Sequence, residues 1–357
     1  MSGLDDVIAA ETSLSEVDGL NGQLVIRGYR LEELAGRRSF EAVLALLLAE
    51  VLDGGEAAIR TALGAARRTV FAEVERIDAA LLELSPVEAL RALMARLPDG
   101  EDAGTALRLV AAPAVFLPAL VRRRRGEAAI PPDPALGQAA DMLAMLKGRR
   151  PSGAETAALD AYLVTVSDHG LNASTFAARV VASTRAGYAS AVLAALGALK
   201  GPLHGGAPGP VLDMLDAVGT PERAAGWLAA ELARGERLMG FGHRIYRVRD
   251  PRADALKQAL ARLGAAGDGD AGRLALAETV EREALALLRR AKPGRALETN
   301  VEFYTALLLE ALGFPREAFT GVFAAGRVGG WIAHAHEQVE KGRLIRPQSR
   351  YVGPRAA

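Results

Sequence analysis

The amino-acid sequence predicts an all-α protein with one small N-terminal β-hairpin. Apolar residues make up 50% of the 357 residues but aromatic residues only 5%. The core must therefore consist mainly of Ala, Leu and Val, which suits closely packed helices better than a β-sandwich. Helix-start signals recur along the chain, whereas strand signals are scarce. At roughly 150 residues per domain, the length predicts about two domains.

Local signals place the elements in order along the chain. Leu24-Val25-Ile26, after a turn over Gly19–Gly22, predicts the hairpin. Helix starts are marked by a capping residue followed by Pro, by Glu or by both, at Ser85-Pro86-Val87-Glu88, at Ser152 with Glu155 and at Thr220-Pro221-Glu222. A later helix is amphipathic, with apolar residues at helical spacing and charges between them: Leu274, Ala277, Val280, Ala284, Leu285 and Leu288.

Two loops separate these helices. Residues 126–133 form a Pro-containing linker after Arg122–Arg125, a basic run that we interpret as a solvated helix end because cations favour the C-terminus of a helix. Residues 264–272 (GAAGDGDAG) predict a flexible surface loop without an apolar anchor.

Composition excludes several classes of protein. Lys and Arg together number 43, as do Asp and Glu, so no overall attraction to nucleic acid or an anionic membrane is expected. The chain has no Cys, which excludes disulfide scaffolds, thiolate metal sites and a cysteine nucleophile. The longest uncharged apolar runs, 109–121 and 186–199, are shorter than the ~20 residues that span a bilayer, and Pro113 and Pro118 interrupt the first. Since the N-terminus also lacks the pattern of a targeting segment, we expect a soluble, cytoplasmic protein.

Three of the five histidines lie beside glycines, where no regular element is expected. They are His204 in GPLHGGA, His243 in GFGHRIYRVRDPR and His169 in DHGLNAS. Glycine lets the backbone approach a ligand closely and lets an imidazole point into a cleft. For any one of them, a structural histidine bonded to a neighbouring turn is an equally good interpretation, but three together favour a site.

Other motifs do not complete a known pattern. No Gly-rich stretch ends in Gly-Lys-Ser/Thr, so there is no phosphate loop, and Gly240-Phe241-Gly242 lacks the rest of the dinucleotide pattern. His334-Ala335-His336-Glu337 is predicted to be helical, which directs the two histidines to different faces. We therefore expect no metal site there.

The histidine motifs resemble those of the citrate synthase family. His204, His243 and the segment Asn300-Val301-Glu302-Phe303-Tyr304 follow one another in the order and spacing of that family. The stretch DHGLNASTFAARVVAST is similar to the family's segment before the first catalytic loop, and the likeness runs from AAETSLSEVDG to RPQSRYVGP.

The resemblance implies a two-domain helical fold and a homodimer of the short type. A large domain would comprise residues 1–206 and 316–357, and a small domain, residues 207–315, would close over a site at the domain junction. The implied reaction is that of an acyltransferase (EC 2.3.3.-) of the tricarboxylic acid cycle. It condenses the co-substrate acetyl-CoA with oxaloacetate and hydrolyses citryl-CoA, without a further cofactor. A 2-methylcitrate synthase using propionyl-CoA and a non-catalytic protein binding CoA or a dicarboxylate remain alternatives.

The resemblance also implies a role for each matching residue. Glu302 would be the general base, His204 would hydrogen-bond the thioester oxygen and His243 would polarise the ketone of oxaloacetate. The remaining implied residues hold the dicarboxylate (His169, Arg252, Arg327 and, from the partner subunit, Arg346), meet a CoA phosphate (Arg247) or orient the histidines (Asn172, Ser174 and Asn300).

Two positions depart from the family pattern. The base is usually Asp, and Glu302 is longer by one methylene. The first catalytic loop is usually followed by Ala-Asn-Glu, where this chain has Ala207-Pro208-Gly209. Because a shift of about 1 Å can cost on the order of a hundredfold in rate, Glu302 predicts altered efficiency or substrate rather than a dead enzyme.

Overall fold

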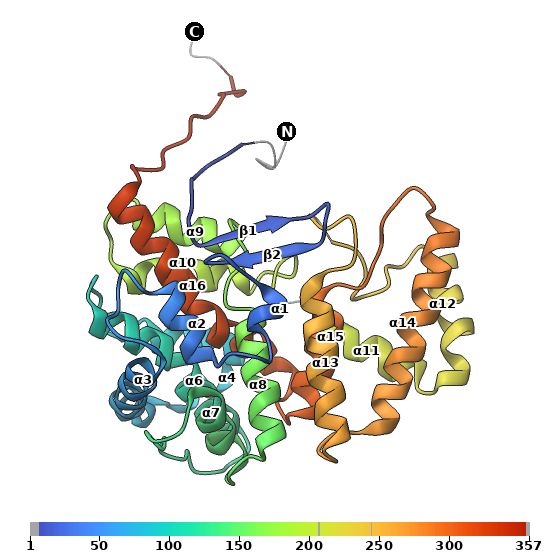
Figure 1. Cartoon of the computed structure of the whole chain (residues 1–357), viewed down its shortest axis with the longest axis horizontal. Helices are drawn as coiled ribbons and strands as arrows, with labels where there is room; N and C mark the ends of the chain where they lie inside the picture. Colours follow the sequence, from blue (N-terminus) through green and yellow to red (C-terminus); the bar gives the residue numbers. More distant parts are fainter. Residues whose placement is uncertain (1–6, 206–207, 244, 355–357) are drawn as a thin grey trace.

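The computed structural model describes residues 7–205, 208–243 and 245–354, which form helices and one small sheet that lies at the edge of the helices (Figure 1). The sheet is antiparallel, in the order β1 (Ser15–Asp18), β2 (Gln23–Ile26) and β3 (Tyr29–Arg30). The predicted all-α fold with an N-terminal hairpin is therefore confirmed, and a short third strand extends the hairpin. The buried side chains of Leu24 and Ile26 fix the face of β2 that meets the helices.

One group of helices surrounds α16 and α6, whose side chains are buried over most of their length. This group comprises α1 (Leu31–Leu34), α2 (Phe40–Leu47), α3 (Glu56–Phe71), α4 (Ala79–Glu83), α5 (Pro86–Met94), α6 (Ala103–Arg124), α7 (Gln138–Lys147), α8 (Gly153–Thr165), α9 (Ala173–Ala182), α10 (Tyr188–Leu199) and α16 (Phe319–Lys341). A second group comprises α11 (Pro208–Val218), α12 (Ala224–Ala233), α13 (Pro251–Ala265), α14 (Ala271–Ala291) and α15 (Val301–Ala311).

The predicted helix starts after Ser85 and Ser152 are confirmed, and the one after Thr220 begins with a 3₁₀ turn instead. Ser152 and Glu155 form a reciprocal capping box at α8, with Ser152 Oγ accepting from Glu155 N at 3.0 Å. Pro86 begins α5, and Pro221 begins a short 3₁₀ turn that leads into α12. The loop predicted over 264–272 is shorter, because α13 continues to Ala265 and α14 begins at Ala271.

Helix α6 corrects the expectation that Pro113 and Pro118 interrupt the apolar run. The helix continues through both prolines, because packing against α3, α5, α7, α10 and α16 outweighs the backbone hydrogen bonds lost at proline. With 22 residues it is long and apolar enough to cross a membrane, but 83% of its apolar window is buried inside the protein. That burial is typical of the core helix of a globular protein.

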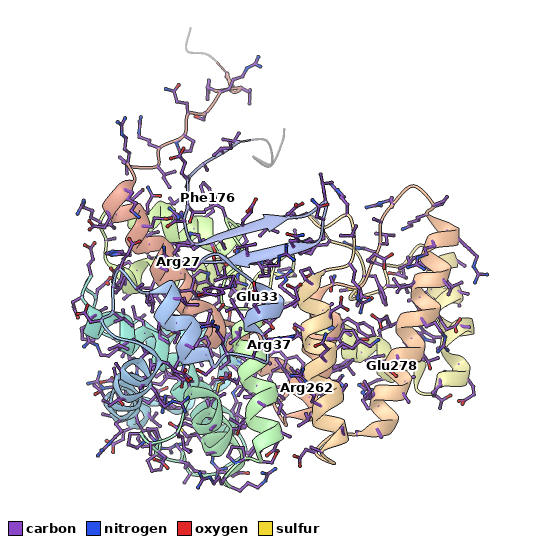
Figure 2. All side chains as sticks on the ribbon, in the orientation of Figure 1. Arg27, Glu33, Arg37, Phe176, Arg262 and Glu278 are labelled. Atoms are coloured by element: carbon purple, nitrogen blue, oxygen red, sulfur yellow. The ribbon has the colours of Figure 1, made fainter. Side chains whose placement is uncertain are left out.

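The two groups of helices meet along α13 and α15. Helix α13 packs on α8 and α1, and α15 also contacts α8, so the second group lies beside α8 (Figure 1). Figure 2 shows Arg37, just after α1, and Arg262 of α13 at this junction. The domain division at 206–207 and 315–316 stays a prediction, and Gly206 and Ala207 lie outside the described residues.

Candidate active site

His204 is held by a hydroxyl at the start of α9. Its Nε2 lies 2.9 Å from Ser174 Oγ, which also lies 2.7 Å from Asn172 Oδ1 and accepts from Trp331 Nε1 at 3.2 Å. Asn172 caps α9 with Oδ1, so this oxygen cannot donate and the single hydroxyl proton of Ser174 goes to it. Neutral His204 therefore carries its proton on Nε2. Burial, helped by the charges of Arg327 and Arg252, lowers the pKa of His204 to about 4.

Asn172 also connects His204 with His169. Its Nδ2 donates to the carbonyl oxygens of His169 and Gly170, at 3.4 and 3.2 Å. His169 is only 5% exposed, and its Nε2 lies 3.1 Å from the hydroxyl of Tyr246. Burial lowers the pKa of His169 well below its usual range. Two of the predicted histidines are thus linked through one amide side chain.

His243 meets His169 edge to face, with 5.8 Å between the ring centroids. Its Nδ1 accepts from the backbone N–H groups of Ile245 and Tyr246, each at 3.0 Å. A ring nitrogen that accepts two hydrogen bonds carries no proton, so the proton of the neutral ring is on Nε2. Burial, with Arg252 as a second cause, lowers the pKa of His243 to about 4, which keeps the ring neutral at pH 7.

Arg252 lies beside the protonated nitrogen of His243. Its Nη2 is 3.2 Å from His243 Nε2, so two donors converge there. The same Nη2 binds Asp250 together with Nε in a fork, with Nε to Oδ1 at 3.0 Å and Nη2 to Oδ2 at 2.8 Å, which leaves the second Nη2 hydrogen for the His243 side. Although burial opposes the charge, Asp250 raises the pKa of Arg252 above its ordinary value. Two adjacent donors create a binding position for an oxygen atom that accepts from both.

Glu302 reaches the site from the first turn of α15. The cap of that helix is Asn300, whose Oδ1 accepts from Glu302 N at 3.0 Å and whose Nδ2 donates to Gly242 O at 2.9 Å. Asn300 thereby fixes the helix that carries Glu302 to the residue before His243. Burial raises the pKa of Glu302 to about 7, with Arg252 opposing and Asp250 supporting that rise. A carboxylate with a pKa near the working pH suits a general base.

Arg327 contributes a buried cation from α16. It is 1% exposed, its Nε donates to Val166 O and its guanidinium lies 4.9 Å from the centroid of the Phe323 ring. Within the part of the chain that the structure describes, its Nη2 is buried without a hydrogen-bond partner. Burial lowers the pKa of Arg327 to about 10, although Asp168 supports the charge. An unpartnered buried guanidinium nitrogen is costly unless an anion binds to it.

Two predicted residues lie apart from this cluster. The side chain of Arg247 is exposed, as is that of Arg346. Arg346 belongs to the extended segment after α16, which leaves the body of the protein (Figure 1). Within one chain the structure does not bring Arg346 to the other site residues.

The His334-Ala335-His336 segment is part of α16, and its two histidines have different partners. His334 Nε2 lies 3.2 Å from both carboxylate oxygens of Asp168, and its Nδ1 accepts from Arg179 Nε at 3.0 Å. His336 Nδ1 meets the hydroxyl of Tyr188 at 2.9 Å. Among the described residues, no group of three or more His, Asp or Glu side chains is arranged to hold a metal ion.

Sequence reasoning missed two residues of the cluster, Asp250 and Tyr246. The signal for Asp250 was available, since Asp-Pro is a cap followed by proline at the first helical position, and Asp250 Oδ1 does cap α13 by accepting from Arg252 N at 3.0 Å. Nothing local marks Tyr246, because its contact with His169 spans 77 residues.

The fold and the site together define a helical enzyme that binds a small anionic substrate. Neutral histidines, two buried arginines and a carboxylate of raised pKa converge from α8–α9, α13, α15 and α16. Such a set can hold carboxylate groups, stabilise a developing oxyanion and remove a proton from carbon.

Comparison of this chain with known proteins identifies its family. The family model described as "Citrate synthase, C-terminal domain" matches residues 3–348. The citrate synthase of Haloferax volcanii is 41% identical over 98% of this chain and 95% of its own length, and a 2-methylcitrate synthase of Mycobacterium tuberculosis is 36% identical over 98% and 90%. The citrate synthase of Thermoplasma acidophilum, solved as a ternary complex with carboxymethyl coenzyme A and oxaloacetate, superposes with a TM-score of 0.86 at 28% identity, covering 99% of this chain and 96% of that one. The chain belongs to the citrate synthase family, and it is a transferase of class EC 2.3.3.-.

Proposed function

We propose that the protein condenses acetyl-CoA with oxaloacetate and hydrolyses the resulting citryl-CoA to citrate and CoA. Two features carry the proposal: His243 Nε2 lies beside Arg252 Nη2, so that two donors converge, and Nη2 of Arg327 is buried without a partner among the described residues. A dicarboxylate with a keto oxygen supplies acceptors for all of them. His169 is the fourth group proposed to hold this substrate.

Glu302 is the proposed base that removes the methyl proton of acetyl-CoA. The carboxylate takes the proton as the thioester becomes an enolate, and the enolate carbon then attacks the keto carbon of oxaloacetate. His243 and Arg252 stabilise the alkoxide formed by that attack, since both already present donors at one point. Arg247 is proposed to meet a phosphate of CoA.

His204 is proposed to hydrogen-bond the thioester oxygen, and this role requires a proton shift. Its proton is on Nε2, directed at Ser174, so Nδ1 has none to donate. If the Ser174 hydroxyl turns from Asn172 to Nε2 of His204, the neutral ring carries its proton on Nδ1 instead. The rotation costs the Ser174–Asn172 hydrogen bond, while Trp331 continues to donate to Ser174 Oγ.

An assay of CoA release tests the proposed reaction. The protein is incubated with acetyl-CoA or propionyl-CoA, each with and without oxaloacetate, and free thiol is measured. We expect release that requires oxaloacetate and is faster with acetyl-CoA. Thiol release that does not depend on oxaloacetate would contradict the proposal. So would a lack of thiol release with both acyl-CoA substrates.

A 2-methylcitrate synthase is the second candidate, favoured by the 36% identity to the Mycobacterium tuberculosis protein of that name. It needs the same catalytic residues and a slightly larger acyl pocket. One methylene in such a pocket is worth only about 1–3 kcal/mol, so the catalytic residues do not separate the two substrates. The ratio of kcat/KM for propionyl-CoA and acetyl-CoA decides between them.

We expect kcat/KM for acetyl-CoA to rise as the pH is raised through about 7. Glu302, whose pKa is raised to about 7, must lose its proton to act as a base, so the active fraction grows above that pH. His204 and His243 have pKa values of about 4, so both stay neutral between about pH 5 and 8 and cause no change of kcat/KM in that range. A profile that is flat over this range, in protein shown by circular dichroism to stay folded, would contradict the assignment.

We also propose a cytoplasmic homodimer in which residues 207–315 close over the site and Arg346 completes the site of the partner subunit. The exposed position of Arg346 after α16 supports this arrangement, because a segment that leaves one subunit can reach another (Figure 1).

Hybrid dimers test the arrangement. Arg346→Ala and His243→Ala subunits should each be inactive alone, and mixing them should restore activity through hybrids with one intact site. About a quarter of the activity per subunit is expected, since half of the dimers are hybrids with one of two sites intact. Verified subunit exchange without recovery would contradict a site shared between subunits.

A further inference from the structure

The N-terminal strand β1 contacts the segments that carry His169 and His243, which face each other in the site. At its start, Ser15 Oγ donates to the buried carboxylate of Asp168 and accepts from Gly170 N at 3.0 Å. Ser15 is therefore bonded to the residues on both sides of His169.

The turn after β1 contacts the other segment. The carbonyl oxygen of Gly19 accepts from the backbone N–H of Arg247 at 2.8 Å. A Cβ atom added at Gly19 would lie 2.5 Å from Ile245 O, so only glycine allows this approach. The turn is rigid by itself, because Asp18 Oδ1 accepts from the backbone N–H groups of Leu20 and Asn21, each at 3.0 Å.

Three successive backbone N–H groups thus have defined partners beside His243. Those of Ile245 and Tyr246 donate to His243 Nδ1, and that of Arg247 donates to Gly19. The first two donors fix the proton of His243 on Nε2, where it points to the oxygen position shared with Arg252. The backbone that orients His243 is therefore held in place from outside by the hairpin.

We propose that the hairpin turn is a positioning element for His243, and that Gly19 is the residue whose lack of a side chain makes this possible. This inference rests on the proposed function, because it assumes that His243 polarises the ketone of oxaloacetate. Strand β1 sets the spacing of the two substrate-binding histidines, with Ser15 at the His169 segment and Gly19 at the His243 segment. Both residues act through other groups and do not touch the substrate.

Gly19→Ala is the sharpest test, with Gly294→Ala as its matched control. Both glycines lie in turns and have ordinary φ values, so neither substitution strains the backbone by itself. A Cβ at Gly294 meets nothing within 4 Å, whereas at Gly19 it collides with the backbone of Ile245. The pair isolates the contact from the general effect of replacing a glycine.

We expect Gly19→Ala to lower kcat by about 10- to 100-fold, because a displacement of about 1 Å at a reacting group costs that much. The KM for oxaloacetate should rise less, since Arg327 still binds the dicarboxylate. Gly294→Ala should match the wild type. Equal kinetic constants for the two variants would overturn the proposal.

A second measurement does not require turnover. Nitrogen-15 NMR of histidine-labelled protein reports which ring nitrogen carries the proton, and with five histidines the His243 signal can be assigned as the one that His243→Gln removes. We expect an unprotonated Nδ1 in the wild type and in Gly294→Ala, and a shifted or averaged signal in Gly19→Ala. An unchanged His243 signal in Gly19→Ala would overturn the proposal. A wild-type protein with this signal but no CoA release would instead contradict the proposed function alone.

Ser15→Ala keeps the proposal testable if Gly19→Ala fails to fold. It should shift the His169 signal and raise the KM for oxaloacetate several-fold, because Gly170 N and Asp168 both lose a partner. Ser85→Ala, which removes only an exposed contact to Glu88, should change neither. A His169 signal and a KM that stay at wild-type values in Ser15→Ala would overturn the part played by β1.

Discussion

Replacing Glu302 by Gln is expected to lower turnover by about 10²- to 10⁴-fold, the usual loss when a general base is removed. The amide has the shape of the side chain but cannot accept the methyl proton. Exchange of the acetyl-CoA methyl protons with deuterated solvent should stop as well, while oxaloacetate binding, carried by the arginines, should remain nearly intact.

Glu310→Gln is the matched control for this variant. Glu310 lies on the same helix, α15, but pairs with Arg273 and Arg316 away from the site. The Glu310→Gln protein should be somewhat less stable than the wild type and should keep its turnover. Glu302→Asp tests the reach of the base: if the backbone is adapted to Glu, the shorter side chain should lower turnover rather than raise it. Unchanged turnover in Glu302→Gln would rule out the assignment.

Replacing Arg327 by Met is expected to weaken oxaloacetate binding by about 30-fold or more, as truncation of a buried ion pair costs about 2–5 kcal/mol. The folded protein itself should be as stable as the wild type or more stable. In the free protein the guanidinium is a buried charge with a lowered pKa, and its Nη2 has no partner among the described residues. Met fills similar space without that cost.

Arg67→Met is the control, and we expect it to lower stability while leaving oxaloacetate binding unchanged. Arg67 is equally buried but binds Asp141 at 2.5 Å and Leu136 O at 2.6 Å. Its loss leaves the Asp141 carboxylate without its cation, so the thermal midpoint should fall while oxaloacetate affinity is retained. Calorimetric titration and thermal unfolding of both variants separate the two effects. An Arg327→Met protein that binds oxaloacetate normally would contradict the dicarboxylate site.

The glycine-flanked histidines were accessible to sequence reasoning, because each is a local pattern whose chemistry is visible in a few residues. Helices that begin with a recognisable capping residue, such as Ser152 at α8, could be predicted for the same reason. The Asn300-Glu302 motif was accessible through its resemblance to a known family. Helix α6 was not, since local rules predict a break at Pro113 that packing on all sides overrides.

The hydrogen bonds that connect the site residues with one another and with the hairpin could not be predicted from local patterns. The proton position on His243 depends on two backbone N–H groups, and that on His204 depends on a hydroxyl 30 residues away in sequence. The contact between Gly19 and Arg247 joins segments that share no motif. Such contacts follow from the path of the chain in space, which short-range preferences do not determine.

The contact of the first segment with the last helix sets a limit on when the protein can become active during its synthesis. Ser13 N donates to Glu337 Oε1 at 2.9 Å, and Arg327 of the same helix donates to Val166 O. A nascent chain must therefore extend 324 residues beyond Ser13 before Glu337 is available to accept this hydrogen bond and α16 can close the core. Contacts of such long sequence separation form slowly and leave apolar surface exposed in the meantime. Truncation shortly before Phe319 should thus yield chains that need a chaperone, rather than a smaller enzyme.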